Sequence, residues 1–283
     1  MMLRSLLYVP ASSDRFIAKA HERGADAIIL DLEDAVAPTE KDSARARLAA
    51  AVASVGRAGA RVFVRINAQP ELMERDAQAA ARAGAFGLLV PKVREPQQLQ
   101  ELARLLDRVE RESSLQQVVL VPMIEDAGAV LDARRIAIAV PRIYALITGG
   151  EDLATSLAAE PVPEVLRLPK LMVHLAAKAA GVLSLGLLRT VADYADLAAV
   201  EKSAREARAF GFDGASCVHP SVVPILNRAF SPSEQELDHA RRLIAAAAKA
   251  TAAGQGAFAF EGRMVDEPVV KRAQALLARA GRA

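Results

Sequence analysis

The chain is predicted to be an α/β protein, a (β/α)8 TIM barrel with a C-terminal helical extension. Eight short apolar runs with strand character recur between residues 5 and 219, and segments with helical spacing and composition lie between them. Polar, chemically competent residues stand where several of these runs end. Because the carboxyl ends of all strands in a parallel barrel open on one face, such residues converge on one site. The sequence therefore predicts an enzyme.

The predicted strands are continuously apolar, as expected where helices cover the outside of a barrel and side chains fill its inside. They cover residues 5–9, 27–32, 61–66, 87–92, 118–125, 143–148, 182–187 and 214–219. Helices are predicted between them, including 38–53, 72–83, 96–110, 128–139 and 196–210. Glycines 24, 59, 84, 181 and 211 each fall shortly before a strand, where a helix must stop and turn.

After Pro232 the pattern changes to helix only. Ser233 and Glu236 have capping-box spacing before a predicted helix over 235–253, and a flexible stretch leads through 258–266 to a final helix. The predicted domains are therefore a catalytic barrel over residues 1–230 and an extension over 231–283. Since eight units already close a barrel, the extension is expected to pack over the barrel mouth or a neighbouring subunit.

Composition limits the function classes. The 283 residues are 52% hydrophobic, enough for a large core, and 36 basic against 34 acidic residues give a net charge of +2 without long blocks of one sign. This does not indicate nucleic-acid binding and leaves small anionic ligands open. A single cysteine, the short apolar start and the lack of a ~20-residue apolar run predict no disulfide, no membrane span and a cytoplasmic location.

Glu125 and Asp152 are the leading candidates for a metal site, because each lies just beyond an apolar strand in adjacent barrel units. Two carboxylates with open coordination positions suit Mg²⁺, which prefers oxygen ligands and retains waters. The alternative is that each simply caps the helix that follows it.

Arg65 ends a predicted strand, where its guanidinium can hold a carboxylate or a developing enolate oxygen. The alternative is a structural ion pair with Asp31, Glu33 or Asp34. That acidic cluster is expected to support the site rather than react directly, with Lys92 and Glu95 as candidate partners for it.

Cys217 and His219 alternate at the end of the eighth predicted strand and raise the possibility of a Cys/His nucleophile pair. No orienting group is evident, so a structural role is favoured. GxSxG, GxxxxGK[ST] and HExxH are absent from the sequence, which argues against the best-known serine hydrolases, P-loop enzymes and zincins.

Taken in order, these motifs resemble the citrate lyase beta subunit-like group of CoA-ester lyases, within the HpcH/HpaI aldolase superfamily. The matching pieces are RSLLYVP at 4–10, the segment 25–38 with DLEDAVAP, RIN at 65–67, PK at 91–92, EDAG at 125–128, GGEDL at 149–153, HP at 219–220 and MVD at 264–266. The resemblance runs nearly from end to end and strengthens the expectation of a barrel.

The resemblance implies that Glu125 and Asp152 bind Mg²⁺ and that Arg65, with Lys92 nearby, contacts substrate or enolate oxygens. It also implies that the CoA arm binds to the opening segment of the chain, around Tyr8, Pro10, Arg15 and Lys19. Asp266 is then an acid/base delivered by the C-terminal segment of an adjacent subunit, in a homotrimer or hexamer.

The implied reaction is reversible carbon–carbon cleavage of a 3-hydroxyacyl-CoA such as malyl-CoA or citramalyl-CoA, which gives acetyl-CoA and an oxo acid. There are two alternatives. The protein hydrolyses the same thioesters, or it is the beta subunit of an acyl-carrier-protein-dependent citrate lyase. The chain departs from the usual pattern at Ala11, at Asp126 in place of threonine, and in 181–186, which lacks the aspartate often found near the seventh strand.

Overall fold

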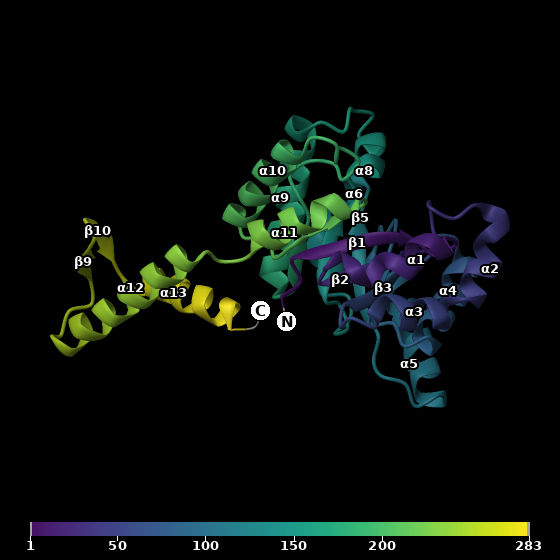
Figure 1. Ribbon diagram of the computed structural model, residues 1–283, viewed down its shortest axis with the longest axis horizontal. Helices are drawn as coiled ribbons and strands as arrows, with labels where there is room; N and C mark the ends of the chain where they lie inside the picture. The colour runs from purple at the N-terminus through teal and green to yellow at the C-terminus, as the bar shows by residue number, and fades with distance from the viewer. Residues whose placement is uncertain (1, 282–283) are drawn as a thin grey trace. The chain divides into compact units, whose positions relative to one another are not determined.

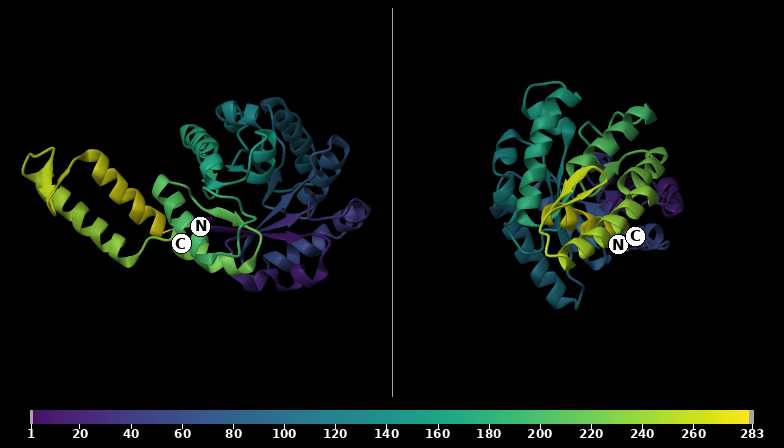
Figure 2. Two further views of the ribbon diagram at one scale, coloured as in Figure 1. Left: turned by 90° about the horizontal axis from the view of Figure 1, so that it is seen from above. Right: turned by 90° about the vertical axis from the view of Figure 1, so that its left-hand side faces the viewer.

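A computed structural model describes residues 2–281 of the chain. These residues form two compact units, one over Leu3–Phe230 and one that comprises the segment from Ser231 onward together with Met2 (Figures 1 and 2). Each unit has its own hydrophobic core.

The larger unit is a closed parallel barrel, which confirms the predicted fold. Its eight strands have the order β7-β6-β5-β4-β3-β2-β1-β8, and a parallel bridge between Leu185 and Gly214 joins the two ends of the sheet. The strands are β1 Ser5–Pro10, β2 Ala27–Asp31, β3 Arg61–Arg65, β4 Gly87–Val90, β5 Val119–Ile124, β6 Ala145–Thr148, β7 Leu183–Leu185 and β8 Ala215–Cys217.

Alternate residues of each strand fill the barrel and face the surrounding helices. Leu6, Ile29, Phe63 and Leu89 belong to the core inside the barrel, whereas their neighbour Leu30, for example, packs in the layer between strands and helices. Burial on both faces explains why the strands are apolar without alternation. Helices lie on the outside of the strands in every view (Figures 1 and 2).

The helical elements of this unit follow the strands in sequence. They are α1 Asp14–Ala20, η1 His21–Arg23, η2 Pro38–Glu40, α2 Lys41–Ala46, α3 Leu48–Gly56, α4 Pro70–Arg82, α5 Pro96–Glu112, α6 Ala127–Leu131, α7 Ala133–Ala137, α8 Gly150–Ser156, α9 Pro163–Ala180, α10 Leu197–Phe210, η3 Pro220–Val222 and α11 Val223–Phe230.

Two predicted helices are broken in the structure. The segment 38–53 divides into η2, α2 and α3, and 128–139 divides into α6 and α7. Arg47 and Asp132 stand at the breaks, with ψ values of 0° and 5° that leave the helical range. Because ψ near zero tilts the next carbonyl away from its helical partner, the regular hydrogen-bond series ends there.

The C-terminal unit contains α12 Glu234–Ala252, β9 Phe258–Phe260, β10 Arg263–Val265 and α13 Glu267–Ala280. The capping box of Ser233 and Glu236 is confirmed. The prediction of helix alone was wrong at the antiparallel β9–β10 hairpin. Glu261 and Gly262 both have positive φ, 48° and 76°, as a two-residue hairpin turn of the favoured twist requires.

None of the helices in residues 2–281 combines the length and the apolarity that crossing a bilayer requires.

Candidate active site

The carboxyl ends of the barrel strands surround a cavity of about 560 Å³, called here the main cavity. This volume lies within the usual range for small-molecule sites. Its lining includes predicted site residues from four different strand ends: Tyr8 and Pro10 of β1, Arg65 of β3, Glu125 after β5 and Asp152 after β6. Asp31, Asp34 and Lys170 line it as well. The fold therefore brings together side chains that lie far apart in the sequence.

Arg65, the last residue of β3, is held by carboxylates of the β2 loop. Its Nε and Nη2 atoms donate to the two carboxylate oxygens of Asp31 at 2.7 and 2.6 Å, and its Nη1 lies 3.1 Å from both Glu33 and Asp34. Burial alone would disfavour the guanidinium charge, but the Asp31 hydrogen bonds and nearby negative charges raise the pKa of Arg65. The ion pair considered from the sequence exists, and the same guanidinium lines the cavity over the ring of Tyr8.

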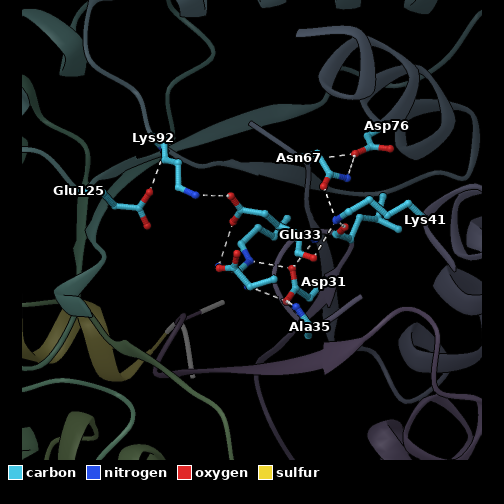
Figure 3. Close-up of polar contacts among 11 residues, drawn as sticks. Asp31, Glu33, Ala35, Lys41, Asn67, Asp76, Lys92 and Glu125 are labelled. Atoms are coloured by element: carbon cyan, nitrogen blue, oxygen red, sulfur yellow. Dashed lines mark hydrogen bonds and ion pairs between the residues drawn. The ribbon is translucent and has the colours of Figure 1, made fainter. Parts of the chain in front are cut away.

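The loop after β2 is fixed from both sides. Asp31 accepts hydrogen bonds from the backbone N–H groups of Glu33 and Ala35, at 2.9 and 3.1 Å. Lys41 donates to the carbonyl oxygens of Leu32 and Glu33, each at 2.9 Å (Figure 3). This loop carries Glu33 and Asp34 toward Arg65. Its backbone N–H and carbonyl groups are held by hydrogen bonds to two charged side chains, the buried Asp31 and the half-buried Lys41.

Lys41 also joins this loop to a buried network. Its ammonium group donates to Asn67 Oδ1 at 2.5 Å, and Asn67 donates through its backbone and side chain to Asp76 Oδ2 at 2.9 and 2.6 Å (Figure 3). Arg45 completes this hydrogen-bonded network, because its Nε donates to Asp76 Oδ1 at 2.6 Å. Sequence reasoning missed Lys41 and Asp76; the available signal was a carboxylate at a helix position otherwise occupied by buried alanines.

Lys92 links Glu33 to Glu125 across the site. Its backbone N–H donates to Glu125 Oε2 at 2.7 Å, and its Nζ lies 3.4 Å from Glu33 Oε1 (Figure 3). The residue has φ 53°, a left-handed conformation that costs a non-glycine residue about 1–2 kcal/mol. This turn ends β4 at Val90, two residues earlier than predicted, and aims the N–H group at Glu125. Glu95, the other suggested partner of the acidic cluster, instead caps α5.

Glu125 is a desolvated carboxylate at the end of β5. It is 5% exposed, and a Cβ on Gly149 would stand 2.2 Å from its Oε1, so the close approach of the β6 loop requires glycine there. Burial raises the pKa of Glu125 to about 7; the Lys92 hydrogen bond opposes this, and the charges of Asp152 and Glu33 add to it. Burial likewise raises the pKa of Glu33.

Neither Glu125 nor Asp152 is the N-cap of the helix that follows it. Asp126 is the N-cap of α6, where it accepts hydrogen bonds from the N–H groups of Gly128 and Ala129, and Gly149 is the N-cap of α8. Asp152 lies inside the first turn of α8. Both carboxylates also line a smaller cavity of about 240 Å³, together with Asp126.

This donor set fits Mg²⁺. Glu125 and Asp152 share a cavity, and burial together with the charge of Asp152 raises the pKa of Glu125, so a divalent cation held by these residues would offset both effects. Across residues 2–281 no group of three or more His, Cys, Asp and Glu side chains is arranged to hold a metal. Few protein ligands and free positions for water or substrate are typical of Mg²⁺ sites.

The remaining predicted residues lie in different surroundings. Tyr8 is partly buried at the cavity, and desolvation raises the pKa of its hydroxyl. Arg15 and Lys19 are exposed on α1 and are not among the residues that line the main cavity. Asp266 belongs to the C-terminal unit, where it caps α13 by accepting the N–H of Val269 at 3.4 Å.

Cys217 and His219 do not form a nucleophile pair, in agreement with the structural role that the sequence favoured. Cys217 is 3% exposed and packs in the layer between strands and helices, where burial raises the pKa of its thiol to about 12. His219 is exposed, stacks on Tyr194 and exchanges a hydrogen bond with Ser221. Ser216 and Val218, rather than Cys217, face the cavity.

The sequence matches the HpcH/HpaI aldolase/citrate lyase family model over residues 4–220, and the chain belongs to this family. A solved structure of the protein CitE from Mycobacterium tuberculosis, in complex with magnesium, acetoacetate and coenzyme A, is 34% identical. It superposes with a TM-score of 0.78 and covers 98% of this chain and 97% of that one.

Curated relatives carry several activities. A citrate lyase subunit beta-like protein from Deinococcus radiodurans is 35% identical over 98% of this chain and 96% of its own. A (3S)-malyl-CoA thioesterase from Cereibacter sphaeroides is 36% identical over 98% and 94%. The mitochondrial citramalyl-CoA lyase of Homo sapiens is 30% identical over 96% and 83%.

Proposed function

We propose that this protein is a Mg²⁺-dependent CoA-ester lyase, which cleaves a 3-hydroxyacyl-CoA such as malyl-CoA or citramalyl-CoA into acetyl-CoA and an oxo acid. The observation that carries the proposal is the meeting of Arg65, Glu125 and Asp152 in one cavity at the strand ends. Family membership and the magnesium, acetoacetate and coenzyme A bound to the related CitE protein support the metal and the substrate class.

Each residue has a distinct role in this reaction. Glu125 and Asp152 hold the ion, and Mg²⁺ supplies a Lewis acid that polarises the oxygen of the forming oxo group. As the substrate hydroxyl becomes the oxo group, its proton passes to the acid/base Asp266, and the electron pair of the broken carbon–carbon bond passes to the acyl-CoA as an enolate. Arg65 offsets the negative charge on the thioester oxygen. Glu33 supports catalysis by holding Arg65 and Lys92 in position.

Completion of the site involves a second subunit in this proposal. Asp266 of a neighbouring protomer returns a proton to the enolate carbon, in a homotrimer or hexamer. Tyr8, Pro10, Arg15 and Lys19 receive the CoA arm. The partners are small molecules, and the proposed location is the cytoplasm.

Hydrolysis of the same thioesters is the second candidate, because a relative at 36% identity is a (3S)-malyl-CoA thioesterase. A beta subunit that acts on acyl-carrier-protein esters is the third, by analogy with the citrate lyase subunits among the relatives. All three use an enolate-stabilising site, so the products distinguish them.

The deciding experiment is a product assay with malyl-CoA and citramalyl-CoA, with and without Mg²⁺, in which oxo acid, acyl-CoA and free CoA are measured separately. Metal-dependent glyoxylate or pyruvate in equal amount to acetyl-CoA is the expected result. Free CoA without oxo acid identifies the thioesterase. Turnover only after addition of an acyl carrier protein identifies the complex subunit.

Substitution tests the metal assignment. Glu125→Gln and Asp152→Asn are each expected to abolish Mg²⁺-dependent turnover and to leave the circular dichroism spectrum unchanged, since each removes one anionic ligand with little change in volume. Full activity in both variants refutes these two residues as the metal ligands.

A further inference from the structure

Lys170 is a buried cation at the wall of the main cavity. It lies on α9, its side chain is 3% exposed, and it lines the cavity together with Arg65, Glu125 and Asp152. Arg65 and Lys170 are the only basic residues of this lining. The roles proposed above for the reaction do not use Lys170.

The contacts of Lys170 do not neutralise its charge. Its Nζ donates one hydrogen bond, to the carbonyl oxygen of Arg189 at 2.8 Å, and it forms no ion pair with any carboxylate in the described part of the chain. Other buried cations are paired: Arg45 lies 2.6 Å from Asp76, and Arg142 lies 2.9 Å from Glu110. An unpaired buried charge is strongly unfavourable. Accordingly, burial lowers the pKa of Lys170 to about 8, although the charge of Glu151 opposes this effect.

The surrounding elements leave a place for an anion. The end of β7 supplies Gly186 rather than a carboxylate, and Glu151 accepts a hydrogen bond from the hydroxyl of Thr190. Lys170 Nζ stands 3.6 Å from the position that a Cβ on Gly150 would occupy. The ammonium group therefore lies beside the first turn of α8, the same turn that carries Asp152.

A carboxylate fits this place better than a phosphate. The neighbouring lining residues from the loop after β7 include Val191 and Ala192, which are apolar, and no second basic side chain of the lining accompanies Lys170 on these elements. One ammonium group balances one carboxylate charge, whereas phosphate recognition normally uses several donors or an arginine fork.

We propose that Lys170 binds a second carboxylate on the oxo-acid half of the substrate, so that the preferred CoA esters are those that release a 2-oxo dicarboxylic acid. This inference rests on the proposed function and extends its substrate class beyond malyl-CoA and citramalyl-CoA, whose oxo acids, glyoxylate and pyruvate, carry a single carboxylate. Lys170 then acts as a specificity-determining residue, because it contacts a part of the substrate that does not react.

The test compares oxo acids that differ only by a methyl group or a carboxylate at the far end. Oxaloacetate is paired with 2-oxobutyrate, and 2-oxoglutarate with 2-oxovalerate, and their dissociation constants are measured by calorimetry at pH 7 in excess Mg²⁺. In at least one pair the wild-type protein is expected to bind the dicarboxylate roughly tenfold to a hundredfold more tightly, the usual effect of a charged hydrogen bond in a buried site.

Lys170→Met is expected to remove this preference and to change the dissociation constant of the methyl-ended acid by less than about threefold. Lys170→Arg is expected to retain part of the preference, since it keeps the charge. Lys178→Met is the matched control, because Lys178 is on the same helix but is half-exposed and paired with Asp213 at 2.6 Å. This control is expected to keep the wild-type preference.

The melting temperature without ligand separates binding from folding. Lys170→Met is expected to melt at or above the wild-type temperature, because an unpaired buried charge is gone; if it fails to fold, Lys170→Gln replaces it in the titrations. Equal weakening of both members of each pair, or no wild-type preference in either pair, overturns the role of Lys170. Glyoxylate and pyruvate, the oxo acids of malyl-CoA and citramalyl-CoA, are titrated in the same way, and failure of these two and of all four paired acids to bind in the presence of Mg²⁺ overturns the proposed function itself.

Discussion

At the residue scale, the paired geometry of Arg65 matters as much as its charge. Asp31 binds the guanidinium through two parallel hydrogen bonds, which a lysine cannot reproduce. Arg65→Lys is therefore expected to lower kcat by about 10²-fold or more, the usual cost of a lost oxyanion donor, with a smaller effect on KM. Steady-state kinetics measures both. Arg75→Lys alters an exposed arginine paired with Asp42 and is the control, expected to retain activity. Wild-type kcat in Arg65→Lys contradicts the role given to Arg65.

Glu125 gives a pH dependence of stability with a definite sign. Its pKa is about 7 in the folded protein, chiefly through burial, against 4.5 as its ordinary value, so the folded state binds this proton more tightly than the unfolded chain. Its contribution to stability is therefore fully present below pH 4.5 and is lost as the pH rises to about 7, by up to about 3 kcal/mol. Chemical denaturation of metal-free protein at several pH values measures it. Glu125→Gln is expected to lack this decline; an identical pH profile in wild type and variant refutes the assignment.

At the scale of elements, the sequence predicted the positions of the strands well, but it did not predict the contacts that hold the loops at the strand ends. Each strand is buried on both faces, so an apolar run marks it to within a few residues, and polar residues at its end mark the site. The helix breaks at Arg47 and Asp132 and the turn at Glu261 depend on backbone angles that no apolar pattern reports. The roles of Lys41 and Lys170 arise from contacts with distant segments, and the sequence around a lysine does not indicate which distant residues it contacts.

Lys41, the first residue of α2, holds a loop at a strand end in this way. Lys41 holds the β2 loop and Asn67 through three hydrogen bonds, so its loss leaves three acceptors without their donor. Lys41→Met is expected to lower the free energy of unfolding by about 2–4 kcal/mol and kcat by at least about tenfold, with Mg²⁺ affinity nearly unchanged. Denaturation, kinetics and metal titration measure the three effects. Lys202→Met, an exposed lysine of α10, is the control. Unchanged kcat in Lys41→Met shows that the loop keeps its geometry without Lys41.

At the scale of the whole molecule, the proposed catalytic groups are divided between the two compact units. Arg65, Glu125 and Asp152 line a cavity of the barrel, whereas Asp266 caps a helix of the C-terminal unit. The MVD motif at 264–266 could be read from the sequence, but the subunit that its aspartate serves could not, because assembly depends on surface complementarity. The proposal that Asp266 acts on a neighbouring protomer therefore needs a test that separates action within a chain from action between chains.

Mixed assemblies provide that test. Glu125→Gln and Asp266→Asn are each expected to be inactive alone, yet co-refolded mixtures are expected to regain part of the activity, since some sites then combine an intact barrel with an intact Asp266 from the adjacent protomer. Activity is assayed after native mass spectrometry has verified mixed oligomers. A mixture of Glu125→Gln with Asp152→Asn is the matched control and is expected to stay inactive, because both changes lie in the barrel and no combination of protomers repairs either site. If the first mixture also stays inactive despite mixed oligomers, Asp266 does not complete a neighbour's site, and the proton must return to the enolate from a group of the same chain.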